Sequence, residues 1–420
     1  MLIKSAKVVD PYSPHNGKTV DILIKGGKIS EIGKSLQAGG KIREFSAKNL
    51  HVSPGWFDMN VHFRDPGFEY KEDIISGAVA AAFGGFTGVA CMPDTDPPLH
   101  TKSEIEYVEN KAKGLAVDVY PIGAISRNLE GKDMAEMYDM KTEGAVAFSD
   151  GKHSIENSQL KSLAILYAKG FDGLMMSYCE EGKIAHDGKM NESETSTVLG
   201  LKGIPALAEE LHVARNIFLA EYHDAKIHFS TISTAKSADL IRQAKKKGLK
   251  ITAEVAVHNL VLDDTLLEGF DSNFKVKPPL RNKKDITALI KGLKDGTIDV
   301  ICSDHSPEDE ESKKVEFDRA AFGIIGLETA YAAVNTSIGD KLSQEELIAK
   351  LAINPRKILQ LEVPTVKEGT EANLTFFDPK KEWTFTENDI RSKSRNTPFV
   401  GTKFTGRALA ISNKGFWVEA

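Results

Sequence analysis

The sequence is poor in cysteine and has neither a basic surplus nor a long apolar run. Its 420 residues include three cysteines and carry a formal net charge of −6. Cys91, Cys179 and Cys302 lie far apart in apolar or strand-like contexts. This spacing excludes a disulfide framework and favours a reducing, cytoplasmic setting.

The missing basic surplus argues against a nucleic-acid partner. The densest cationic runs, KSADLIRQAKKKGLK and RNKKD, are typical of solvated helix faces and loops. No apolar stretch is long enough to cross a bilayer. The first residues, MLIKSAKVVDPYS, lack the apolar core and cleavage site of a signal peptide. We therefore expect no membrane partner.

Both ends of the chain alternate apolar and polar residues between Gly-rich turns, a pattern typical of short β-strands. Hydrophobic residues make up 41% and charged residues 27%, which is ordinary for a globular protein. The strand-rich ends predict one small β-sandwich domain built from residues 1–52 plus 365–420. The remaining segment, residues 53–364, has a different pattern.

In this middle segment, short β-like runs alternate with helices whose apolar residues recur at i, i+3 and i+4. About eight such units follow one another, from residues 85–93 to residues 297–308. Repeated β-then-α units predict a parallel sheet, and eight of them predict a closed (β/α)8 TIM barrel. An open doubly wound sheet is the alternative, but no G-x-G-x-x-G follows the first strand.

Catalytic residues of such barrels lie at the C-terminal ends of the strands. In DMNVHFRDPG, residues 58–67, the pattern Asn60-Val61-His62 stands where a barrel hydrolase would carry H-x-H. Residues i and i+2 of a strand point the same way, so two histidines there can hold one metal ion. The other polar strand ends are Arg64, Asp94, Asp150, Tyr178-Cys179-Glu180, Thr231, His258 and Asp304-His305.

These strand ends resemble those of class I dihydroorotases, of the cyclic amidohydrolase superfamily. The matching stretches run nearly end to end and include SPGWFDMNVHFRDPGFEYKEDIISG, GAVAFSDG, EVAVHNL, KVKPPLRN, GTIDVICSDHSPE and INPRKILQL. The resemblance implies a TIM barrel of the metal-dependent hydrolase type with a small β-domain from both termini. It also implies the reversible closure of N-carbamoyl-L-aspartate to dihydroorotate in pyrimidine biosynthesis, with zinc polarising the amide carbonyl.

Three of the family's ligand histidines are replaced in this sequence. Asn60 takes the place of the first H-x-H histidine, Tyr178 that of the H-C-E histidine and Thr231 that of the H-V-S-T histidine. An amide oxygen, a phenol and an alcohol are poor zinc donors compared with imidazole. We therefore expect no tightly bound zinc.

At three of the metal-ligand positions, this sequence has the residue type that the resemblance implies. The second H-x-H histidine is His62, and the bridging acid corresponds to Asp150 in a shortened S-D-G motif. The last ligand, which the family also uses as its catalytic acid–base, is Asp304. These three residues are the metal site that remains if any metal binds.

The family's substrate contacts are also altered. Arg64 is kept at the position whose guanidinium clamps the substrate carboxylate. Asp94, Lys277 and Glu308 stand where the family has asparagine, asparagine and histidine. Two of these changes add negative charge beside an anionic substrate. Lys277 could replace the missing metal charge through an ion pair with Asp304 or Asp150, because a buried carboxylate needs a cation.

Together these features predict a dihydroorotase-like protein that is catalytically impaired or inactive and has a structural or regulatory role. The resemblance suggests aspartate carbamoyltransferase as its partner, and we also expect a homo-oligomer. One alternative is an active dihydroorotase with an atypical mononuclear zinc site. Another is a binding protein that uses Arg64 to hold a small carboxylate ligand.

Overall fold

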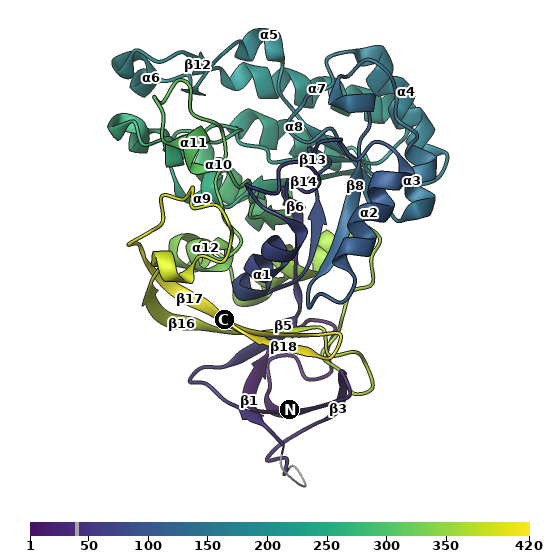
Figure 1. The fold of residues 1–420 in the computed structure, drawn as a ribbon, viewed down its shortest axis with the longest axis vertical. Coiled ribbons are helices and arrows are strands. Elements are labelled where there is room, and N and C mark those ends of the chain that lie inside the picture. Colours follow the sequence, from purple (N-terminus) through teal and green to yellow (C-terminus); the bar gives the residue numbers. More distant parts are fainter. Residues whose placement is uncertain (38–41) are drawn as a thin grey trace.

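Strands from the two ends of the chain form one mixed eight-stranded sheet. The computed structural model describes residues 1–37 and 42–420. β5 pairs antiparallel with β16 and so joins the N-terminal strands to the C-terminal ones (Figure 1). In the order of the sheet, the strands are β18 (Phe416–Glu419), β17 (Lys403–Asn413), β16 (Leu374–Thr384), β5 (His51–Pro54), β1 (Leu2–Val8), β2 (Thr19–Lys25) and β3 (Lys28–Gly33), with β4 (Glu44–Phe45) beside β1.

The middle of the chain forms a parallel eight-stranded barrel. Its strands are β6 (Trp56–Val61), β7 (Phe86–Cys91), β8 (Asp118–Gly123), β9 (Ala147–Phe148), β10 (Met175–Tyr178), β13 (Ile227–Ser230), β14 (Ile251–Ala256) and β15 (Val300–Cys302). The first and last strands meet where the His62 amide donates to the His305 carbonyl at 2.8 Å. The predicted fold, a TIM barrel with a small β-domain from both termini, is confirmed.

Helices surround the barrel (Figure 1). The longer ones are α1 (Ile74–Gly84), α2 (Lys102–Ala112), α3 (Met137–Glu143), α4 (Ser158–Lys169), α7 (Ala206–His223), α8 (Ala235–Lys246), α10 (Lys283–Lys294) and α12 (Ala330–Ile338). Short elements at the loops include α5 (Gly182–Ala185), β11 (Met190–Asn191), α6 (Glu194–Leu199), β12 (Gly203–Ile204), α9 (His258–Val261), α11 (Glu310–Lys313), α13 (Gln344–Ile348) and α14 (Asn354–Ile358).

Alternate strand residues serve two separate cores, because successive side chains of a strand point to opposite faces. Val89 and Cys91 of β7 join the large apolar cluster between strands and helices. Ala90 and Met92 belong to a smaller cluster inside the barrel. This packing fixes the strand register and thereby fixes which side chains reach the barrel mouth.

All three cysteines are buried and free, so the predicted absence of a disulfide framework is confirmed. Among the described residues, no helix is both long and apolar enough to cross a bilayer. The domain boundaries at 52/53 and 364/365 stay a prediction.

Candidate functional site

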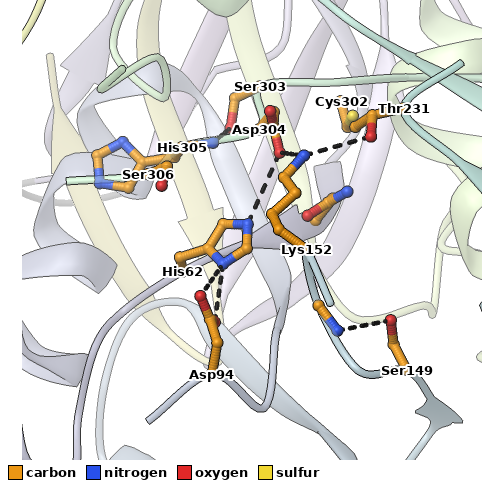
Figure 2. A network of polar contacts seen from close by, with 12 residues as sticks. His62, Asp94, Ser149, Lys152, Thr231, Cys302, Ser303, Asp304, His305 and Ser306 are labelled. Atoms are coloured by element: carbon orange, nitrogen blue, oxygen red, sulfur yellow. Dashed lines mark hydrogen bonds and ion pairs between the residues drawn. The ribbon is translucent and has the colours of Figure 1, made fainter. Parts of the chain in front are cut away.

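A lysine ammonium lies at the centre of the barrel mouth. Lys152, in the loop after β9, places its Nζ 2.7 Å from Oδ1 of Asp304, which follows β15 (Figure 2). The same Nζ donates to Oγ1 of Thr231 at 3.2 Å and lies 5.2 Å from the centre of the Tyr178 ring. Asp304, Thr231 and Tyr178, three residues for which the sequence resemblance predicted metal-ligand positions, are thus in contact with one cation of this chain.

Asp304 is buried, with 2% of its surface exposed. Burial raises the pKa of its carboxyl, but Lys152 and the hydrogen bond from His62 lower it by more, so that the net pKa is about 2. The carboxylate is therefore ionised at neutral pH and held by the surrounding positive charge.

His62 lies between two carboxylates. Its Nδ1 is 2.8 Å from Asp94, and its Nε2 is 3.7 Å from Oδ1 of Asp304 (Figure 2). Burial lowers the pKa of the imidazole, whereas Asp94 and Asp304 raise it, and the net pKa is raised. Both carboxylates thus stabilise the imidazolium form of His62, which has no lone pair for a metal.

Arg64 is bound by groups of its own chain. Its Nη1 lies 2.6 Å from Asp94, and its Nη2 lies 2.8 Å from both Glu308 and the Ser306 hydroxyl. Lys71 adds a second cation to Glu308 at 2.6 Å. Two carboxylates at altered family positions thus take the place that a substrate carboxylate would need.

Asn60 and Tyr178 contact neighbouring carboxylates. The Asn60 amide donates to Oε1 of the fully buried Glu254 at 2.6 Å. The Tyr178 hydroxyl donates to Glu180 at 3.1 Å. Burial, followed by the charge of Glu180, raises the pKa of Tyr178 well above its usual value, so the phenol is neutral. Neither group is a zinc ligand in this state.

Asp150, the predicted bridging acid, binds the backbone of the segment that follows β8. Its carboxylate accepts the amides of Ile125 and Ser126 at 2.8 and 2.9 Å and also accepts the Ser126 hydroxyl. Burial raises the pKa of this carboxyl by more than those hydrogen bonds lower it. No hydrogen bond or ion pair in residues 1–37 and 42–420 joins it to His62 or Asp304.

The sequence prediction for Lys277 was wrong in its partner. Its Nζ lies 2.7 Å from Glu180, and Lys152 is the cation that neutralises Asp304. Sequence reasoning missed Lys152 because the family gives that position no ligand. The available signal was its place two residues after Asp150, in a loop at the mouth.

The residues at the mouth do not fit a catalytic zinc ion. Within the described part of the chain, no three His, Cys, Asp or Glu side chains are grouped so as to hold a metal. The two predicted ligands that lie nearest each other are His62 and Asp304. His62 lies 2.8 Å from Asp94, and Asp304 lies 2.7 Å from the Lys152 ammonium. A zinc ion there would meet the Lys152 ammonium, which lies 2.7 Å from Asp304.

A cavity of about 300 Å³ opens over this network. Its lining includes Arg64, Lys152, Lys277 and Phe322. This volume lies at the lower end of the range for small-molecule sites. The cavity contains cations, but those three already have carboxylate partners within the chain.

The Asp304 ion pair should contribute more stability than the Lys277 pair. Lys152→Met leaves a buried carboxylate without its nearest cation and should lower the free energy of unfolding by about 3–5 kcal/mol. Lys277→Met should cost about 1 kcal/mol or less, because its pair with Glu180 is more exposed. Urea unfolding followed by circular dichroism measures both, with the exposed Lys283→Met as control. Equal decreases in the free energy of unfolding for Lys152→Met and Lys277→Met would contradict the assignment of Lys152 as the cation that stabilises Asp304.

Stability should depend on pH through Asp304. Its folded pKa of about 2 lies below the value of about 4 in an unfolded chain, so its contribution is present above pH 4 and is lost as pH falls toward 2. At pH 6, the free energy of unfolding of the wild type should exceed that of Asp304→Asn by about 2–3 kcal/mol. This difference should become smaller toward pH 3. Thermal unfolding across this range tests it, and a gap independent of pH would refute it. Asp187→Asn, at an exposed carboxyl, is the control.

Comparisons with known proteins agree with the geometry of the fold. Residues 50–237 match the family model "Dihydro-orotase-like", and residues 179–413 match the "Amidohydrolase family". An L-hydantoinase (dihydropyrimidinase) from Arthrobacter aurescens has the same fold, with a TM-score of 0.87 at 23% identity, over 100% of this chain and 95% of that one.

Two curated relatives are similar over almost their whole lengths. The dihydroorotase of Geotalea daltonii is 44% identical over 410 residues, and that of Acetivibrio thermocellus is 45% identical over 410 residues. In both cases the match covers 97% of this chain and 96% of the relative. This chain therefore belongs to the dihydroorotase family of the amidohydrolase superfamily.

Proposed function

We propose that this chain serves pyrimidine biosynthesis as a dihydroorotase-family protein that has lost zinc-dependent hydrolysis. The observation that carries the proposal is the Lys152 ammonium, 2.7 Å from the Asp304 carboxylate. In the family, zinc supplies Lewis acidity and a hydroxide at this mouth. Here the Lys152 ammonium balances the carboxylate and offers neither.

The acid–base chemistry of Asp304 supports the proposal. An efficient general base has a pKa near the working pH. With a pKa of about 2, the Asp304 carboxylate is a weak base at neutral pH. The ion pair that keeps it charged also removes its tendency to take a proton from water or substrate.

The state of Arg64 points the same way. The Arg64 guanidinium would have to release Asp94 and Glu308 before it could bind a substrate carboxylate. Both acids would then remain at the mouth and repel an anionic substrate. A binding protein for small carboxylates meets the same obstacle, although the cavity of about 300 Å³ offers it room.

An active dihydroorotase with an atypical mononuclear metal is the second candidate. Relatives 44–45% identical over 97% of this chain carry the name dihydroorotase, and this favours the second candidate over the loss of activity. His62 and Asp304 would be its remaining ligands. For them to bind a metal, Lys152 would have to leave Asp304.

A structural or regulatory role requires a partner, and we propose aspartate carbamoyltransferase, as the family resemblance suggests. We also propose a cytoplasmic setting. The three free cysteines, all buried, support a reducing environment but say nothing of the partner.

Metal content and activity separate the two main candidates. Protein purified without chelator should contain far less than one zinc per chain and should not hydrolyse dihydroorotate after zinc is added, because Lys152 occupies the ligand set. Elemental analysis and an absorbance assay measure this. Stoichiometric zinc, with activity that a chelator removes, would establish the active candidate.

A matched variant sharpens that test. Restoring the imidazoles with Asn60→His, Tyr178→His and Thr231→His, together with Lys152→Met, should raise zinc content. The same three histidines with Lys152 kept should bind less zinc, because the ammonium still holds Asp304. Equal zinc content in both variants would show that Lys152 does not block the site.

The partner is tested by native co-purification. A tagged chain expressed in its own cells should retain aspartate carbamoyltransferase through gentle washing, and mass spectrometry identifies it. The tagged chain should be present in excess over aspartate carbamoyltransferase. If it is then recovered without that enzyme, the partnership is contradicted.

A further inference from the structure

A second cavity lies at the opposite end of the barrel from the mouth. Its volume is about 350 Å³, within the range of small-molecule sites. Its lining includes Asp118 and Tyr120 of β8, Arg356 of α14, and Asn373 and Lys414 beside β16 and β17. β8 begins at Asp118, so this basal cavity lies at the N-terminal ends of the barrel strands, where the terminal sheet meets the barrel (Figure 1). It shares no lining residue with the mouth cavity and is independent of the proposed function.

A buried guanidinium without an acidic partner lines the basal cavity. Arg356 is 4% exposed. Its Nη1 donates to the carbonyls of Gly55 and Ala352, and its Nη2 donates to Oγ1 of Thr87 at 3.0 Å. A guanidinium has five N–H donors, so one on Nε and one on Nη2 remain without an acceptor in residues 1–37 and 42–420. No carboxylate of those residues forms an ion pair with Arg356.

This guanidinium is cationic at neutral pH, although burial lowers the pKa of Arg356 to about 10. A buried cation without a partner of opposite charge is costly. A bound carboxylate reduces that cost, because it can accept two parallel hydrogen bonds from one guanidinium. The free donors of Arg356 therefore favour a ligand with a carboxylate group.

Two further donors belong to the lining. The Asn373 side-chain oxygen accepts the Thr87 hydroxyl at 2.6 Å, and its Nδ2 has no acceptor among the residues that the structure describes. The Tyr120 ring lies 5.7 Å from that of Phe57, and the Arg356 guanidinium lies 5.0 Å from the same ring. Burial raises the pKa of Tyr120 to about 12, so the phenol keeps its proton and can donate it. This part of the cavity suits a group that accepts hydrogen bonds.

The outer part of the basal cavity carries unpaired negative charge. Glu362 and Glu371 belong to its lining, are exposed and form no ion pair within the described part of the chain. The third acid of the lining, Asp118, pairs with Lys414 and accepts the Asn413 amide at 3.0 Å. Two free carboxylates would repel phosphate or another purely anionic ligand and would attract an ammonium group.

We propose that the basal cavity binds a small amino acid. The ligand carboxylate binds Arg356, and the ligand ammonium faces Glu362 and Glu371. Val363 and Pro364 of the same lining offer apolar contact to an aliphatic side chain. Such a ligand contacts the barrel and the terminal sheet together and therefore stabilises the contact between them.

Titration calorimetry of the full-length chain with the standard amino acids tests the proposal. At least one of them should bind with a dissociation constant below about 1 mM. The same compound without its amino group, and inorganic phosphate, should each bind at least about 10-fold more weakly, because the two free carboxylates repel them. If no amino acid binds, the proposal is overturned. Equal affinity for the compound without its amino group would also overturn it, since the site would then recognise an anion only.

Variants of the lining test each half of the ligand. Tyr120→Phe removes one donor and should weaken the binding of the best amino acid about 3–10-fold. Glu362→Gln/Glu371→Gln should bring the affinity for that amino acid close to the affinity for its analogue without the amino group. The matched control Glu194→Gln/Glu311→Gln changes two exposed acids elsewhere and should leave the affinity unchanged. Unchanged binding in both lining variants would refute the site.

Two arginine variants locate the ligand. Arg356→Gln, with its folding checked by circular dichroism, should lower the affinity at least about 10-fold. Arg64→Met at the mouth should leave it unchanged. If Arg64→Met abolishes binding, the ligand lies at the mouth and the basal site is refuted. If Arg356→Gln does not fold, the Tyr120 and glutamate variants decide. The zinc test concerns the mouth alone, so either proposal can fail without the other.

Discussion

The barrel mouth depends on the cost of burying a carboxylate. Asp304 is 2% exposed at the end of the last barrel strand, and an ionised carboxylate there is stable only beside positive charge. In a zinc enzyme the metal ion supplies that charge. In this chain, the Lys152 ammonium supplies that positive charge from a loop, 2.7 Å from the Asp304 carboxylate. Asp94 and Asp304 also raise the pKa of His62, which favours its cationic form. The barrel can therefore keep its acidic residue without a metal.

The other changes at the mouth are consistent with that solution. Thr231 accepts a hydrogen bond from the Lys152 ammonium, which an imidazolium in its place would repel. Tyr178 offers its ring to the same cation. Asp94 joins His62 to Arg64, so the negative charge it brings is neutralised within the chain. These replacements form one network in which each charged group has a partner of opposite sign.

The fold around this network is that of its relatives. Strand pairing, the inner and outer apolar cores and the composite terminal sheet need no metal, because they rest on apolar burial and backbone hydrogen bonds. Thr231 and Asp304 both have positive φ, at 46° and 52°, an unusual conformation for residues other than glycine. Such backbone is frequent at functional sites.

The sequence by itself determined the barrel and the composite β-domain, because the alternation of apolar and polar residues is a local property that the chain shows along its length. It also identified the need for a cation near Asp304. Only the tertiary structure decided which lysine meets that need. Lys152 and Lys277 both lie in loops at the mouth, and nothing in their neighbouring residues distinguishes a side chain that reaches Asp304 from one that reaches Glu180. That choice depends on how loops after different strands pack over the barrel, a long-range property that sequence spacing does not encode.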